Sequence, residues 1–97
     1  MDDVEARSVL AAALEPLRKL TYEELVARML DSIETIEVVG PSGASYQIEL
    51  QGFWDDPRRP GETLHVLGGI DDGTLRAAFS PLDDGFLVAP DGSFLGE

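Results

Sequence analysis

The chain has 97 residues, a formal net charge of −12 and no cysteine. This length supports one domain with one hydrophobic core, and a hydrophobic fraction of 43% favours a folded globule over a disordered tail. The absence of cysteine excludes disulfides and thiolate metal sites, and the negative charge disfavours binding to nucleic acid or to an anionic membrane.

The sequence also lacks the signals of membrane insertion and export. It has no long apolar run, and the acidic start at Asp2 and Asp3 has no basic segment followed by an apolar one. We therefore expect a cytoplasmic protein without a membrane span. Most of the negative charge falls after residue 31, because residues 32–97 hold twelve acidic and three basic residues, against seven and four in residues 1–31.

Residues 1–31 are predicted to form a layer of two helices. Asp2 and Asp3 suit a helix start, because negative charge stabilises the positive end of the helix dipole. Pro16 disfavours helical backbone in the residue before it, so this helix is predicted to end near Leu14 or to kink there. Its apolar face has the spacing of an amphipathic helix and comprises Ala6, Leu10, Ala13, Leu14 and Leu17.

The second helix has a well-defined predicted start at Thr21. Thr21 and Glu24 have the spacing of a capping box, and Leu20 and Leu25 can pack around it as a hydrophobic staple. We interpret the apolar stripe of this helix as core rather than as a ligand groove. The stripe comprises Tyr22, Leu25, Val26, Met29, Leu30 and Ile33.

An antiparallel sheet is predicted after the helices. Residues 35–39 are rich in β-branched side chains, and a turn at 40–43 leads into the clearest strand, residues 45–51. In that strand Tyr46, Ile48 and Leu50 alternate with polar residues, which predicts one face in the core and one face in water. Phe53 and Trp54 are candidates to continue it.

Three further strands are expected toward the C-terminus. They are predicted at residues 63–66, with Ile70 as a candidate continuation, at 75–79 after an Asp-Gly turn at 71–73, and at 86–89 after a turn at 81–85. Residues 93–95 either add a sixth strand or lie across the core. The connections are too short for parallel crossovers.

The order of these elements predicts a single α+β domain over residues 1–97. We expect two N-terminal helices, within residues 1–31, packed on one face of an antiparallel β-meander of about five strands, within residues 33–97. This arrangement is a two-layer sandwich. The alternative is a strongly bent, barrel-like sheet with the helices at one end.

Four Asp-rich segments raise the question of calcium binding. They lie at residues 55–56, 71–73, 83–85 and 91–92, and none matches an EF-hand loop or a regular calcium-binding repeat. Because Asp-Gly is also a preferred sequence of hairpin turns, we interpret these segments as structural turns. We predict no metal and no cofactor, since the sequence contains no phosphate-binding or dinucleotide-binding loop either.

His65, the only histidine, is a candidate general base. Such a base needs an orienting partner and a nucleophile or water within reach. Glu37 and Glu49 are candidate partners in the sheet, but the sequence has no nucleophile motif. We therefore predict no catalytic residue. A small enzyme or ligand-binding domain that uses carboxylates and His65 is the alternative function.

Trp54, the only tryptophan, stands between the clearest strand and a proline-rich loop that carries Arg58 and Arg59. Tryptophan and arginine dominate many protein interfaces, so this region is a candidate interface. The alternative is that Trp54 caps the end of the core with an arginine stacked on its ring. The polar face of the sheet is a second candidate surface, because helices on one face leave the opposite face open.

Together these observations predict a non-enzymatic protein-binding module for a basic protein partner, present as a monomer or a weak homodimer. A purely structural domain of a larger assembly is the third hypothesis. The candidate partner-binding residues are Gln47, Glu49, Phe53, Trp54, Arg58, Arg59, His65 and Arg76.

Overall fold

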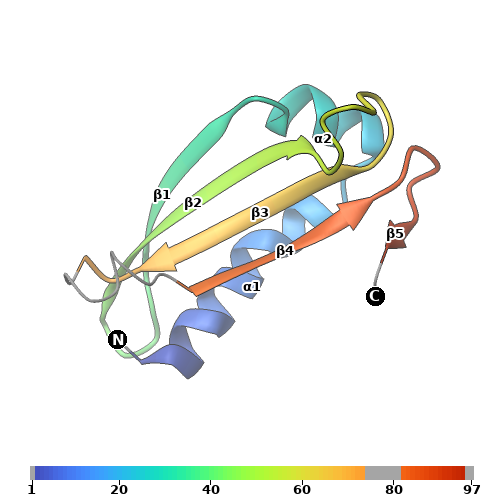
Figure 1. The fold of residues 1–97 in the computed structure, drawn as a ribbon. Coiled ribbons are helices and arrows are strands. Elements are labelled where there is room, and N and C mark those ends of the chain that lie inside the picture. The colour runs from blue at the N-terminus through green and yellow to red at the C-terminus, as the bar shows by residue number, and fades with distance from the viewer. Residues whose placement is uncertain (1, 74–81, 96–97) are drawn as a thin grey trace.

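Two helices followed by an antiparallel sheet make up residues 2–73 and 82–95, the part of the chain that the computed structural model describes. The helices are α1 (Asp3–Arg18) and α2 (Tyr22–Met29). The strands are β1 (Ile33–Val39), β2 (Ser45–Trp54), β3 (Leu64–Asp71), β4 (Leu82–Val88) and β5 (Phe94–Leu95). They lie side by side in chain order and every neighbouring pair is antiparallel, so the sheet is a meander (Figure 1).

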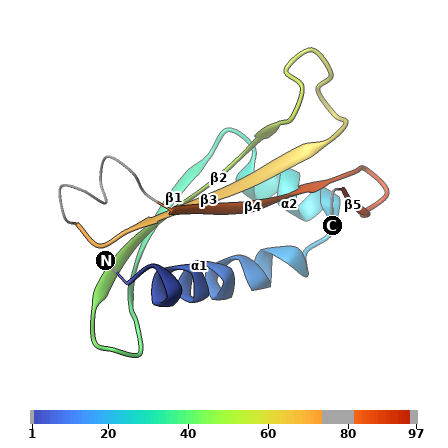
Figure 2. The same cartoon turned by 60° about the horizontal axis from the view of Figure 1, so that its bottom comes forward.

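Both helices pack on the same face of the sheet. α1 packs against β3 and β4, and α2 packs against β2 and β3. Figure 2 shows α1 along one face of the sheet, and neither described helix lies over the opposite face. The predicted two-layer α+β fold is therefore confirmed. The barrel-like alternative is wrong, because β1 and β5 lie at opposite ends of the strand order and the sheet stays open.

α1 begins at a side-chain cap and continues past its proline. The Asp2 carboxylate accepts a hydrogen bond from the Glu5 N–H at 3.1 Å. The predicted end near Leu14 is wrong, since the helix runs to Arg18 and includes Pro16. Pro16 lies in the last turn, where it removes a single backbone hydrogen bond, and the buried side chain of Leu17 holds that turn on the sheet.

α2 begins with the predicted capping box. The Glu24 N–H donates to Thr21 Oγ1 at 3.1 Å, and the Thr21 N–H donates to Glu24 Oε1 at 3.0 Å. The hydrogen bond from the Thr21 N–H, followed by the interaction with the Thr21 side chain, lowers the pKa of the Glu24 carboxyl. Ile33, predicted as the end of the α2 stripe, instead begins β1 and is exposed, because the helix ends at Met29.

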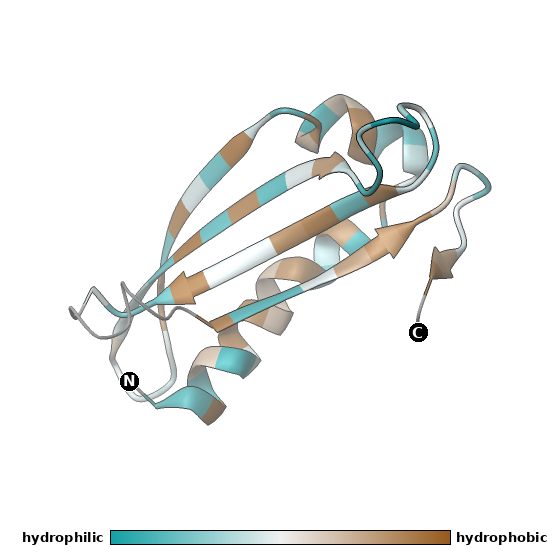
Figure 3. Cartoon of the chain, viewed as in Figure 1, coloured by the Kyte–Doolittle hydropathy of each residue, from teal (hydrophilic) through white to brown (hydrophobic). Residues whose placement is uncertain are grey.

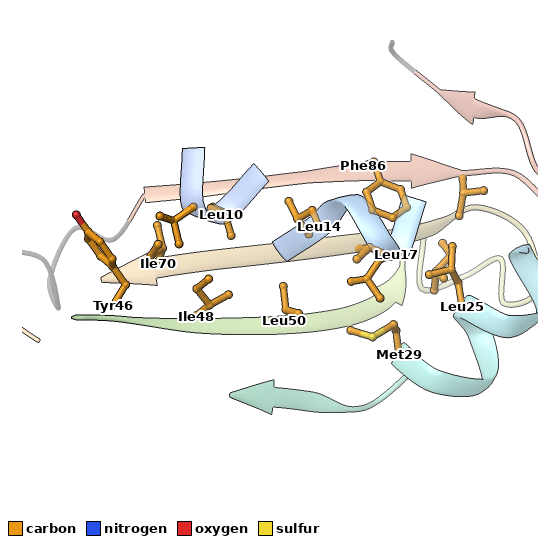
Figure 4. Close-up of a cluster of buried hydrophobic side chains, with 14 of the residues drawn as sticks. Leu10, Leu14, Leu17, Leu25, Met29, Tyr46, Ile48, Leu50, Ile70 and Phe86 are labelled. Atoms are coloured by element: carbon orange, nitrogen blue, oxygen red, sulfur yellow. The ribbon is translucent and has the colours of Figure 1, made fainter. Parts of the chain in front are cut away.

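The core is built on the alternating side chains of β2. Tyr46, Ile48 and Leu50 are buried, and Gln47 and Glu49 between them are exposed, as the sequence predicts. Figure 3 shows this alternation of hydrophobic and hydrophilic residues along the strand. Figure 4 shows the buried side chains of the sheet meeting those of both helices, including Leu10, Leu14, Leu17, Leu25 and Met29.

The strand beside β3 differs from the one that the sequence predicts. The predicted strand at 75–79 lies outside the described residues, and β3 pairs with β4. Residues 83–85, predicted as part of a turn, therefore lie inside a strand, and that prediction is wrong. Phe86 and Val88 bury their side chains on the inner face. From these two residues β4 continues back through residues 83–85. Gly85 has a steric role, because a Cβ there would overlap the carbonyl oxygen of Val66.

Glu5 connects α1 to the hairpin between β1 and β2. Its carboxylate accepts hydrogen bonds from the Tyr46 hydroxyl at 2.7 Å, the Ser42 hydroxyl at 2.7 Å and the Ser42 N–H at 3.0 Å. The Tyr46 bond, followed by those of Ser42, lowers the pKa of Glu5. The same bond to Glu5, together with burial, raises the pKa of Tyr46 to about 12.

Replacing Glu5 should make the protein less stable in a pH-dependent way. A lowered carboxyl pKa adds stability above the pKa of the unfolded chain, about 4.3, and this contribution is lost as the pH falls through the folded value. E5A should lower the urea midpoint at pH 7, and its difference from wild type should narrow below about pH 4. E15A, on the exposed face of α1, is the matched control and should leave the midpoint unchanged. If E5A lowered the urea midpoint equally at pH 7 and below about pH 4, this account would be contradicted.

The stability should also fall at alkaline pH through the same contact. Because the folded pKa of Tyr46 is raised to about 12, its contribution is complete below the unfolded pKa of about 10 and is lost between the two values. Y46F removes the hydroxyl and should therefore flatten the stability profile over that pH range. Urea unfolding at pH 9 to 11 measures the change.

Gly52 is required by the close approach of α2 to β2. A Cβ on Gly52 would lie 2.8 Å from the Cβ of Met29 and 2.9 Å from the Met29 carbonyl oxygen. G52A should lower the free energy of unfolding by about 1–3 kcal/mol, because backbone must shift to accept the methyl group. G69A is the control, since a Cβ there has its nearest neighbour at 3.8 Å, and it should be neutral or slightly stabilising.

Candidate protein-binding face

One row of side chains crosses four strands on the side of the sheet opposite α1, here called the outer face. Strand register places Phe53 beside His65, His65 beside Leu87, and Leu87 beside Leu95. The rings of Phe53 and His65 are 4.7 Å apart between centroids. Phe53 and Leu95 remain 37% and 40% exposed, so the row is open to solvent.

A second row lies next to the first and adds two apolar residues. Ile33 is paired with Gln51, Gln51 with Leu67, and Leu67 with Gly85. Together the two rows make up the apolar end of the outer face. Its residues are Ile33, Phe53, His65, Leu67, Leu87 and Leu95.

The other end of the outer face is acidic. Register places Thr35, Glu49, Gly69 and Asp83 in one row and Glu37, Gln47 and Asp71 in the next. The acidic end therefore holds four carboxylates. Among the described positions of the outer face there is no lysine or arginine. The face thus combines a hydrophobic area with adjoining negative charge.

A shallow, open hollow of about 510 Å³ lies where β3, β4 and β5 meet. His65, Leu67, Leu87 and Leu95 line its apolar side, and Asp83 lies on its acidic side. Gly85 also lines the hollow. The hollow is open to solvent and is therefore unlike an enclosed substrate pocket.

His65 does not meet the predicted acidic partners. Register places Glu49 opposite Gly69, which is four residues along β3 from His65. At the rise of a β-strand, four residues correspond to about 13 Å between His65 and Gly69. Glu37 lies one row further along the sheet. The contact that the structure shows for His65 is the ring of Phe53.

Trp54 lies on the other side of the sheet from Phe53. It is partly buried against the core and lines an apolar groove of about 420 Å³ with Tyr22, Val26, Ala27 and Gly61. The two neighbouring aromatic residues therefore cannot serve one interface. The interpretation of Trp54 as the cap of the core agrees with this position, although no arginine of the described residues stacks on its ring.

The loop arginines pair with acidic residues of their own loop. Arg58 Nε lies 3.2 Å from a carboxylate oxygen of Asp56, and Arg59 lies 3.8 Å from Asp56 and 3.7 Å from Glu62. A cation–π contact is formed elsewhere, by Arg18 over the ring of Phe86 at 4.7 Å. The loop is joined to α2 by the Tyr22 hydroxyl, which donates to the Glu62 carbonyl at 2.6 Å.

The structure thus divides the eight predicted binding residues among several places. Arg76 lies outside the described residues. Four of them, Gln47, Glu49, Phe53 and His65, lie on the outer face. Arg58 and Arg59 lie in the loop after β2, and Trp54 lines the apolar groove beside α2. Sequence reasoning missed Ile33, Leu95, Asp71 and Asp83, because only cross-strand register shows that they share this face.

Aspartates in two of the Asp-rich segments bind their own turns. Asp91 accepts hydrogen bonds from the Ser93 hydroxyl at 2.6 Å and the Ser93 N–H at 2.9 Å, which lower its pKa. Asp71 accepts from the Gly73 N–H at 2.8 Å. Within residues 2–73 and 82–95, no group of three or more carboxylates or imidazoles is arranged to hold a metal ion.

Comparison with known proteins adds no relative to this description. No protein-family model, curated protein or solved structure matches the chain. Of the two described helices, neither is long and apolar enough to cross a membrane. Functional inference therefore depends on the residues and geometry of this chain.

The opposite orientations of Phe53 and Trp54 predict different costs of truncation. W54A should lower the free energy of unfolding by about 3 kcal/mol, because it removes a large side chain from the edge of the core. F53A should cost about 1 kcal/mol or less, since its ring lies on an open face. Urea unfolding at pH 7 compares the two variants, and equal losses would contradict the assignment of the two faces.

Proposed function

We propose that the chain is a non-enzymatic protein-binding module, whose outer face docks a protein partner with apolar side chains beside lysine or arginine. The observation that carries this proposal is the row of Phe53, His65, Leu87 and Leu95 next to the acidic end, on a face without a helix. The cysteine-free, acidic sequence supports a cytoplasmic location for this module.

The apolar end would supply most of the binding free energy. Exposed apolar side chains that lie together, bordered by polar residues, are typical of protein interaction sites. Phe53 would be the anchor, because a large aromatic side chain near the middle of an interface excludes water from the surrounding contacts. The hollow beside His65 would accept an apolar side chain of the partner.

The acidic end would select the partner and speed its approach. Glu37, Glu49, Asp71 and Asp83 have no cation beside them among the described residues of the outer face. A basic partner is attracted to such a surface, whereas an acidic protein or a nucleic acid is repelled. The loop after Trp54 would lie at the rim, because the charges of Arg58 and Arg59 are already offset by Asp56 and Glu62.

A small enzyme or ligand-binding domain is the second candidate function. The observation in its favour is that His65 and Asp83, which share the outer face, line the same hollow. NMR spectra of the protein with a library of small polar ligands would test it. Shifts confined to the residues of this hollow would favour ligand binding over protein binding.

Site-specific photo-cross-linking in the source cells would test the docking proposal. A benzophenone side chain at position 53 should capture the partner, and one at position 4 should not. Val4 is the matched control because it is an apolar residue on α1 that is 81% exposed. Capture of the same proteins from both positions would contradict a specific role for the outer face.

The affinity for the captured and purified partner should then depend on both ends of the outer face. F53A should weaken binding at least about tenfold, as expected for a central aromatic anchor. E49K combined with D83K should mainly slow association and remove most of its dependence on salt. R58A is the control at the rim and should change the dissociation constant by less than about twofold. Surface plasmon resonance at two salt concentrations measures all three.

A further inference from the structure

β1 is the edge of the sheet, and one side of its backbone is unpaired within the described residues. It is first in the strand order and pairs only with β2. No hydrogen bond among residues 2–73 and 82–95 reaches its other side. Figure 1 shows β1 along the border of the sheet. An open edge of this kind is a template for pairing with another strand.

The hairpin geometry shows which backbone groups point outward. The Gly40 N–H donates to the Ala44 carbonyl at 2.8 Å, so this is a hydrogen-bonded pair at the end of the ladder. Hydrogen-bonded and non-hydrogen-bonded pairs alternate along an antiparallel ladder. Even-numbered residues of β1 therefore direct their backbone groups to β2. The residues that direct theirs to the open edge are Ile33, Thr35, Glu37 and Val39.

The side chains of β1 are unusually apolar for an exposed edge. Ile33, Ile36 and Val39 are 65%, 38% and 68% exposed. The strand contains no lysine, proline or glycine, the residues that commonly protect an edge from pairing. Of its two acidic residues, Glu34 is paired with Arg28 at 3.3 Å. This leaves Glu37 as the single uncompensated charge on the strand.

A second copy of β1 matches this edge in one antiparallel register. With Ile36 on the two-fold axis, Ile33 lies opposite the partner's Val39, and Thr35 lies opposite the partner's Glu37. Every outward-pointing residue then meets another outward-pointing residue, which forms about eight hydrogen bonds. Apolar side chains face apolar ones on the outer face, and the two copies of Ile36 meet on the inner face.

Neighbouring registers are less favourable. A shift by two residues in one direction places Glu37 opposite the partner's Glu37, and like charges directly opposite each other destabilise a sheet. A shift by two in the other direction places Ile33 opposite the partner's Glu37. The self-complementary pattern therefore selects the register centred on Ile36.

We infer that the protein forms a symmetric homodimer by antiparallel pairing of β1, which joins the two five-stranded sheets into one continuous sheet. This goes beyond the proposed function, because it uses the edge of the sheet and leaves Phe53 and His65 free. The two outer faces lie on the same side of the joined sheet. α1 packs over β3 and β4, so it does not stand in the way of the partner strand.

The dimer should be weak and should respond to salt in the opposite sense to partner docking. An interface of one strand from each copy lies below about 1,200 Å², so dissociation is expected in the micromolar range. Each copy has a net charge of −12, and the two Glu37 side chains are diagonal neighbours. Salt screens this repulsion and should strengthen the dimer, whereas it should weaken binding of a basic partner.

Sedimentation velocity of the full chain, from about 10 to 500 µM, tests the inference. The wild type should shift from monomer toward dimer, and more so at higher salt. I36K should weaken the dimer at least about tenfold, because two ammonium groups would meet at the axis. V4K, at an exposed apolar position on α1, should leave it unchanged. A monomer at all concentrations and salt levels would overturn the inference, as would a dimer that I36K does not affect.

Single cysteines test the register, because the natural chain has none. In I36C the two thiols would face each other in a non-hydrogen-bonded pair with about 4.5 Å between Cα atoms, which permits a disulfide. Oxidised glutathione should therefore cross-link I36C. In I33C, an exposed site on the same strand, the two thiols would be about 20 Å apart and should not cross-link. Equal cross-linking of both variants would overturn the proposed register.

Discussion

Tyr46, Ile48 and Leu50 point into the core from alternate positions of β2, and the rest of the structure depends on this constraint. A slip of one residue would turn all three side chains into water. Antiparallel pairing then passes the same division of faces to both neighbours, so Leu64, Val66 and Ile70 of β3 also point inward. The helices form the second layer by packing on these inward-pointing side chains. The outer face is the opposite face of the sheet, which they do not cover.

Two helices are too few to cover a five-stranded sheet. α1 and α2 cover β2, β3 and β4, which leaves the inner side of β1 only partly protected and the outer face uncovered by either of these helices. The outer face and the β1 edge, for which we propose roles, are exposed because the two helices do not cover them. The outer face combines apolar and acidic ends and suits a basic partner, and the β1 edge is self-complementary and suits a second copy. Partner binding and dimer formation are expected to depend on salt in opposite ways. Measurements at several salt concentrations can therefore distinguish the two interactions in one preparation.

Much of the fold could be predicted from local patterns, and the errors have physical causes. The capping box at Thr21 and the alternation from Tyr46 to Leu50 were read correctly, because each depends on residues close together in the chain. Pro16 predicts an end or a kink of α1 near Leu14, but the helix continues to Arg18, where Leu17 is buried in its last turn. Residues 83–85 have the composition of a turn, yet pairing with β3 draws them into β4. In both cases tertiary contacts overrode local preference.

The sequence by itself determined the two-helix layer followed by antiparallel strands, the inward side of β2 and the charge of the molecule, because periodicity, capping and composition are properties of neighbouring residues. Only the tertiary structure decided which residues share the outer face. Phe53, His65, Leu87 and Leu95 come from four strands, and it is register that aligns them. It likewise decided that β2 continues through Phe53 and Trp54, so that their side chains face opposite sides, and that β1 is an edge, since both depend on strand pairing between distant segments.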